Sequence, residues 1–125
     1  MKIIITTKNL DLTPSLNVLV NQKVEKLRKF INVLKEKLPE KGKSLAEVFV
    51  EIEKVSKHHK KGDVFKTEII IVLPGKKLVS ESHGSDLLKT VIEAKDELEI
   101  EIKKYKSRSA ELVRKEQKRA EKSVK

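Results

Sequence analysis

The chain has 125 residues, enough for one domain with a hydrophobic core and too few for two. It carries 29 lysines and arginines against 19 aspartates and glutamates, and this net charge of +10 favours an acidic partner such as nucleic acid. There is no cysteine, which excludes disulfides, thiolate nucleophiles and cysteine-bound metals. No apolar stretch reaches the length of a signal-peptide core or a membrane span, so we expect a cytoplasmic protein without a membrane partner.

The first two predicted elements are a strand and a long helix. Residues 3–7 are a β-branched run typical of a strand. Thr13 and Pro14 then fit a helix cap followed by proline at the first helical position. Apolar residues recur at three- and four-residue intervals along one amphipathic helix, which Pro39 is expected to end: Leu16, Val20, Val24, Leu27, Ile31, Leu34 and Leu38.

Three strands are predicted next. Residues 46–55 alternate, with Val48, Val50 and Ile52 toward a core and Phe49 and the glutamates toward water. Residues 64–73 contain an aliphatic run that favours a central, well-covered strand. Pro74 and Gly75 form a turn signal, so residues 78–82 should return as a fourth strand.

A second helix is predicted from a cap at Ser85 or Asp86, with an apolar stripe that runs from Leu87 to Tyr105. The resulting fold class is α+β: a single domain in the order strand-helix-strand-strand-strand-helix, with both helices on one face of a four-stranded sheet. We assign residues 1–106 to this domain. Residues 107–125 have no sustained apolar stripe and are interpreted as a frayed helical extension or a mobile basic tail.

The positive charge is unevenly distributed. Residues 1–45 carry a net +6 and residues 107–125 a net +4, whereas residues 86–106 carry a net −1. Lys23, Lys26 and Lys29 recur along one flank of the first helix and fit either a row of phosphate contacts or a solvated face. The loop sequence from Lys57 to Lys61 fits either a polyanion contact or a soluble hairpin tip.

Patterns for catalysis and metal binding are weak. His58 and His59 are adjacent and should point apart, and His83 is distant in sequence. The four glycines lie beside separate turns, and Ser80 and Ser82 lack a nucleophile elbow. We expect no enzyme activity, cofactor, metal or small-molecule substrate. Paired aromatic residues for base stacking are also missing, so RNA would be bound through its phosphates and shape.

Three stretches together resemble the ribosome hibernation promoting factors, also called ribosome-associated inhibitor or sigma-54 modulation proteins. They are IIITTKNLDLTPSLNVLVNQKVEKLRKF, HHKKGDVFKTEIIIVLPGKKLVSES and SDLLKTVIEAKDELEIEIKKYK, in that order, and the similarity covers about residues 1–106. The resemblance implies a fold similar in layout to double-stranded RNA-binding domains. It also implies binding in the decoding region of the small ribosomal subunit, where the protein would block messenger RNA and transfer RNA.

By position, Lys23, Lys26 and Lys29, and also Lys104 and Lys106, match basic positions of the family. Where many members have a Lys-Leu-Glu-Arg segment, this chain has glutamate at 97 and isoleucine at 100. No second domain follows, so the chain resembles a short form and is expected to be monomeric away from the ribosome. The candidate RNA-binding residues are Lys23, Lys26, Arg28, Lys29, Lys57, His58, Lys60, Lys61, Lys95, Lys103, Lys104, Lys106 and Arg108.

Two other functions stay open at this point. The chain could be a generic double-stranded RNA-binding module that acts away from the ribosome, or a protein-interaction domain whose charge serves only solubility. Competition by unrelated RNA and the salt dependence of RNA affinity distinguish these possibilities.

Overall fold

The computed structural model describes residues 1–37, 46–55, 64–73 and 75–123, with side chains for residues 1–33, 46–55, 64–73 and 75–108. The elements follow the order β1 (Lys2–Lys8), α1 (Pro14–Val24), the 3-10 turn η1 (Glu25–Leu27), α2 (Arg28–Lys37), β2 (Glu47–Val55), β3 (Val64–Leu73), β4 (Lys76–Gly84) and α4 (Leu87–Ser123). This order confirms the predicted α+β class.

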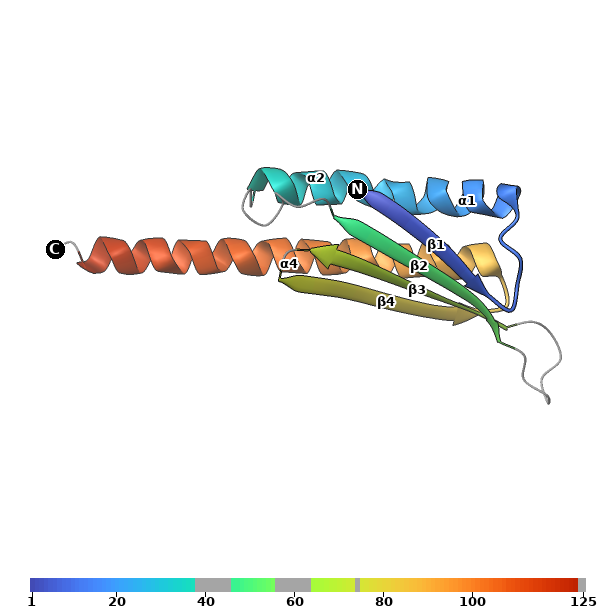
Figure 1. Ribbon diagram of the computed structural model, residues 1–125. Helices are drawn as coiled ribbons and strands as arrows, with labels where there is room; N and C mark the ends of the chain where they lie inside the picture. The colour runs from blue at the N-terminus through green and yellow to red at the C-terminus, as the bar shows by residue number, and fades with distance from the viewer. Residues whose placement is uncertain (38–45, 56–63, 74, 124–125) are drawn as a thin grey trace.

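The sheet has the strand order β1-β2-β3-β4. β1 pairs in parallel with β2, and the other two pairs are antiparallel. A parallel pair needs a crossover connection, which α1 and α2 provide. The helices all lie on one side of the sheet, as Figure 1 shows, and α4 continues well beyond the ends of the strands. The other face of the sheet therefore has no helix over it in the described part of the chain.

The predicted first helix is divided in the structure. It begins as expected, because the Thr13 hydroxyl accepts a hydrogen bond from the Leu16 amide at 3.2 Å and Pro14 occupies the first turn. One 3-10 turn then separates α1 from α2. An ion pair between Glu25 and Arg28 spans this turn, and 3-10 geometry places residues three apart directly above one another. The predicted end at Leu38 and Pro39 lies outside the described residues.

The core lies between the sheet and the helices. The alternating prediction for β2 is confirmed, since Val48, Val50 and Ile52 are buried and its glutamates are not. The buried apolar residues are Val20, Val24, Leu27, Ile31, Ala46, Val48, Val50, Ile52, Ile69, Ile71, Leu73, Leu78, Val91, Ala94, Leu98 and Ile102. Burial of this set, at roughly 25 cal/mol per Å² of apolar surface, is the main force that holds the helices on the sheet.

Buried hydroxyl groups fix α4 in place over β3 and β4. The Ser80 hydroxyl donates to the Ala94 carbonyl at 2.7 Å, and the Thr67 and Thr90 hydroxyls lie 2.8 Å apart. Gly84 permits a close approach at the same junction, because a Cβ there would lie 3.2 Å from the Thr90 methyl group. These contacts set the position of α4 more specifically than apolar burial alone.

Three features differ in detail from the sequence prediction. β3 is central, but helices cover only one of its faces, so Ile70 and Val72 lie on the open side. β4 extends two residues beyond the predicted 78–82 at each end. α4 continues without interruption through residue 106 to Ser123, and the division into residues 1–106 and 107–125 stays a prediction. Asp86 provides the predicted cap, since its carboxylate accepts from the Lys89 amide at 3.2 Å.

Candidate nucleic-acid interface

The lysine row of the first helical segment follows α1, the 3-10 turn and α2. Lys23 is half-buried, whereas Lys26 and Lys29 are exposed. In a continuous α-helix, a spacing of three residues falls about 60° short of a full turn. The 3-10 turn reduces this rotation, because residues three apart eclipse each other there. The three ammonium groups are therefore better aligned than an uninterrupted helix would place them.

Arg28 lies beside this row but shares its charge with a neighbour. Its guanidinium pairs with Glu25, and this hydrogen bond and the attraction of the carboxylate raise the pKa of Arg28. Both side chains are exposed. The arginine thus stays fully cationic, and a phosphate would have to compete with Glu25 for it.

The ring of Phe30 in α2 lies close to lysines of both α2 and α4. The Lys29 ammonium lies 5.2 Å from the centre of its ring, and the Lys103 ammonium of α4 lies 5.3 Å from it. The ring packs against the core, and its cation–π contacts favour both lysines. Charge from α2 and α4 thereby converges on one surface, although 74 residues of sequence separate the two lysines.

A second basic cluster lines a shallow groove of about 310 Å³ between the start of β4 and α4. Lys104, Tyr105 and Arg108 contribute to it from α4, and Lys76 and Lys77 contribute from β4. The two β4 lysines were missed by sequence reasoning. The sequence does show a pair of lysines directly after the Pro-Gly turn. Only the packing of α4 beside β4 shows that this pair shares a groove with Lys104 and Arg108.

Lys95 differs from the other candidate residues. It is 7% exposed, and its ammonium lies 2.6 Å from an Asp96 oxygen and 2.9 Å from a Glu99 oxygen. Burial lowers its pKa, but the hydrogen bonds and charges of the two carboxylates outweigh this and raise the pKa overall. Its charge is already balanced within the protein, and a role in RNA binding stays a prediction.

The remaining candidates are distributed between described and undescribed segments. Arg108 is exposed and Lys106 is half-buried on α4. Ile100 is 52% exposed beside Lys103 and Lys104. The loop residues Lys57, His58, Lys60 and Lys61 lie outside the described residues. The structure thus brings Lys29 and Lys103 together at Phe30, and Lys104 and Arg108 together with the β4 lysines.

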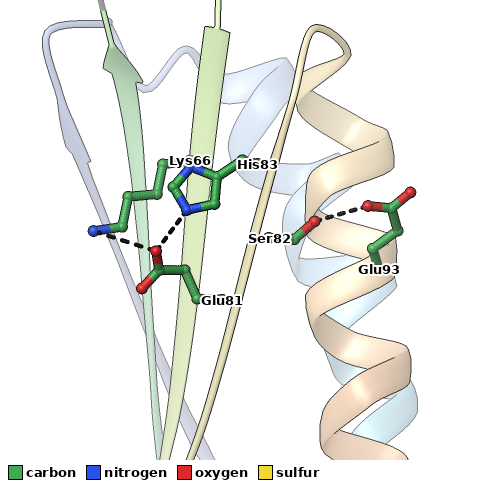
Figure 2. Close-up of polar contacts among 5 residues, drawn as sticks. All are labelled: Lys66, Glu81, Ser82, His83 and Glu93. Atoms are coloured by element: carbon green, nitrogen blue, oxygen red, sulfur yellow. Dashed lines mark hydrogen bonds and ion pairs between the residues drawn. The ribbon is translucent and has the colours of Figure 1, made fainter.

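The open sheet face carries a different set of side chains. Figure 2 shows the alternation along β4, where Ser82 points to Glu93 of α4 while Glu81 and His83 project from the opposite side. There His83 Nε2 lies 2.6 Å from Glu81 Oε1, and the Lys66 ammonium lies 3.7 Å from the same oxygen. Among the described residues, no group of three or more His, Asp or Glu side chains could hold a metal ion.

The described helices include no segment apolar enough to cross a membrane. In a comparison with solved structures, the chain is similar to the N-terminal domain of Protein Y from Thermus thermophilus, with 22% identity and a TM-score of 0.63, over 84% of this chain and 99% of that one. It is also similar to a ribosomal subunit interface protein from Coxiella burnetii, with 20% identity and a TM-score of 0.60, over 86% of this chain and 99% of that one. At these identities the likeness shows the fold. No curated protein matches the chain.

A comparison with models of protein families identifies the family of this chain. The model for sigma-54 modulation protein / S30EA ribosomal protein matches residues 3–110, which include most of α4 and all of the sheet except Lys2. The match covers well over half of the sequence and agrees with the resemblance carried by the three sequence stretches. The chain therefore belongs to the sigma-54 modulation / S30EA ribosomal protein family of ribosome-associated factors.

Proposed function

We propose that the protein binds the small ribosomal subunit at the decoding region and blocks messenger RNA and transfer RNA sterically, in the cytoplasm and without chemistry. The observation that carries the proposal is the convergence of lysines from α2 and α4 around Phe30, in a chain of this family. Ammonium groups on a rigid surface suit folded ribosomal RNA, since they contact phosphates and release counterions.

The helical side supports this function by its construction. Lys26 and Lys29 are exposed on a segment whose apolar face is anchored in the core, so the ammonium groups are held without an ordering cost for the backbone. The groove with Lys76, Lys77 and Arg108 extends the basic surface to the edge of β4. A surface of this extent fits several phosphates, whereas stacked base recognition would need paired exposed aromatics.

The end of α4 gives the proposal a second part. α4 has 37 residues, which corresponds to a length of about 55 Å at 1.5 Å per residue. Residues 107–125 carry a net +4. We propose that this helical extension lies along the messenger channel. Deletion of residues 107–125 should weaken subunit binding and translation inhibition, and unchanged values for both would show that the extension merely trails.

The central experiment is co-sedimentation of the protein with purified small subunits across a salt series. Excess unrelated duplex RNA is added first, and messenger RNA with initiator transfer RNA is added in a second series. We expect saturation near one copy per subunit that resists duplex RNA and is displaced by messenger and transfer RNA. Translation inhibition in a purified system should follow the same competition.

Two results would contradict the proposal. Release by duplex RNA alone would indicate a generic double-stranded RNA-binding module that acts away from the ribosome. An RNA affinity with almost no salt dependence would indicate that the charge serves solubility only. Sedimentation equilibrium of the free protein tests the expectation of a monomer in the same buffers.

A further inference from the structure

The open face of the sheet carries an apolar row that crosses all four strands. The register pairs Ile4 with Phe49, Phe49 with Ile70, and Ile70 with Val79. The first three side chains are partly buried by their neighbours, and Val79 is 51% exposed. Cross-strand neighbours stand about 5 Å apart, so the row is about 14 Å long. It is an apolar strip on a face that no described helix covers.

A row of carboxylates lies directly beside this strip. The register places Glu51 opposite Glu68 and Glu68 opposite Glu81, each two residues from the apolar row on its own strand and all displaced in the same direction. Like charges directly opposite each other destabilise a sheet, which makes this arrangement costly without a partner. Glu81 is shared by His83 and Lys66. Glu51 and Glu68 line a shallow hollow of about 110 Å³ with Glu53 and Lys66.

The balance of charge on this face is opposite in sign to that of the chain. The outward positions of the four strands hold five glutamates, four lysines and one histidine, in a protein of net charge +10. Lys2, Lys8 and Lys77 lie at or next to the ends of their strands, whereas the three glutamates in register lie toward the middle, with Lys66 as the one lysine beside them. Phosphate groups would be repelled from that middle region, which makes RNA a poor occupant of the face.

We propose that the open face binds a basic amphipathic helix of a partner protein. This inference rests on the proposed function, because on a ribosomal subunit such a helix would belong to a ribosomal protein. Side chains on one face of a helix recur about every 5–6 Å along its axis, which matches the spacing of strands in a sheet. A helix lying across the strands would set an apolar stripe on Ile4, Phe49, Ile70 and Val79, and a lysine or arginine stripe on Glu51 and Glu68.

The test uses the free full-length protein and a synthetic peptide of ~14 leucines and lysines, long enough as a helix of about 21 Å to cross the sheet. Leucines occupy one helical face and lysines the other, and a matched peptide has glutamate in place of lysine. Amide shifts in the protein are followed by NMR as each peptide is added. We expect saturable shifts at Phe49, Glu68 and Val79 with the lysine peptide and none with the glutamate peptide.

Two variants locate the binding. Glu51→Gln with Glu68→Gln should weaken binding of the lysine peptide about 10-fold, since each substitution removes one ion pair with the peptide. The control, Asp11→Asn with Glu97→Gln, makes the same change in net charge at exposed positions away from the open face and should keep the wild-type affinity. Val79→Thr should weaken binding without a change in charge or in the fold.

Several results would overturn the inference: shifts confined to the helices, equal loss in the control variant, or binding of both peptides alike. Shifts on the open face with duplex RNA would show that RNA occupies it. Self-association that disappears in Glu51→Gln with Glu68→Gln would show that a second copy of the chain does. Because the titration contains no ribosome, its outcome is independent of whether the protein binds the small subunit.

Discussion

The two sides of this protein present opposite chemistry on one small scaffold. The helical side offers lysines from α2 and α4 around Phe30, and a groove at its edge, where α4 meets β4, is lined by Lys76, Lys77, Lys104 and Arg108. The open sheet side offers an apolar row and a row of glutamates in register. The net charge of +10 therefore describes neither surface by itself.

This difference follows from the periods of the two kinds of element. A strand alternates strictly, so one short sequence such as residues 47–53 supplies valines to the core and glutamates to water. A helix exposes more than half of its circumference, which leaves room for lysines on both flanks of the buried stripe. The core separates the two surfaces. A polyanion bound to the helical side would therefore be far from the carboxylates of the open sheet face, and their repulsion would be weak.

The largest effect should come from charge reversal on the helical side. Lys26→Glu with Lys29→Glu should weaken small-subunit binding by about 100-fold at moderate salt, because each lost phosphate contact also removes released counterions. The slope of log affinity against log salt should become shallower by about 2. Co-sedimentation across a salt series measures both quantities, and circular dichroism checks that the domain still folds. Wild-type affinity in this variant would refute the assignment of the lysine row.

The matched control for this prediction makes the same change in net charge at the other side of the molecule. Lys2→Glu with Lys8→Glu alters two exposed residues at the ends of β1. We expect its affinity for the subunit to stay within about threefold of the wild type, since long-range effects are screened over about 10 Å. An equal loss in both variants would mean that only the total charge matters.

A smaller effect is expected at the groove beside β4. Lys77→Gln with Lys104→Gln should weaken subunit binding about 10-fold, because two phosphate contacts are lost. The effect is smaller than that of the lysine row because the Lys104 ammonium lies 3.7 Å from a Glu101 oxygen, and this ion pair reduces its attraction for a phosphate. Lys2→Gln with Lys8→Gln is the control of equal charge. Affinity that is unchanged in the groove variant would restrict the interface to the lysines around α2 and Phe30.

Ser80 on β4 and Glu68 on the adjacent strand β3 compare the two faces of the sheet in terms of stability. Ser80→Ala should lower the free energy of unfolding by about 1–2 kcal/mol, because the Ala94 carbonyl loses a buried hydrogen bond. Glu68→Gln, on the open face, should raise it by a few tenths of a kcal/mol by relieving repulsion within the glutamate row. Urea unfolding of both variants measures the two values. Destabilisation by Glu68→Gln would mean that the carboxylate row is held by attractive contacts.

The sequence predicted much of the fold because local patterns determine it. The Thr13 cap, the alternation of β2 and the apolar stripe of α4 are each set by residues close in the chain. The prediction was incomplete where distant segments meet. The apolar character of Ile70 and Val72 predicted that both faces of β3 are covered by other elements. The local sequence does not indicate which face of a sheet the helices cover. For the same reason Lys76 and Lys77 were missed, and Lys95 looked like a free cation although two carboxylates neutralise it.

The smallest effect is expected at Lys95, which tests whether a lysine paired within the protein stabilises the fold or binds RNA. Its pKa is raised above the ordinary value of 10.5, so its ion pairs stabilise the protein fully below that pH. The contribution is lost as pH rises through the higher pKa of the folded state. Because Asp96 is 55% exposed, we expect a loss of less than about 1 kcal/mol. Urea unfolding between pH 9 and about 12 should show this decline in the wild type relative to Lys95→Met. Subunit binding by Lys95→Met at neutral pH should stay near the wild-type value if the lysine serves the fold, whereas a loss as large as that of the lysine row would place it in the interface.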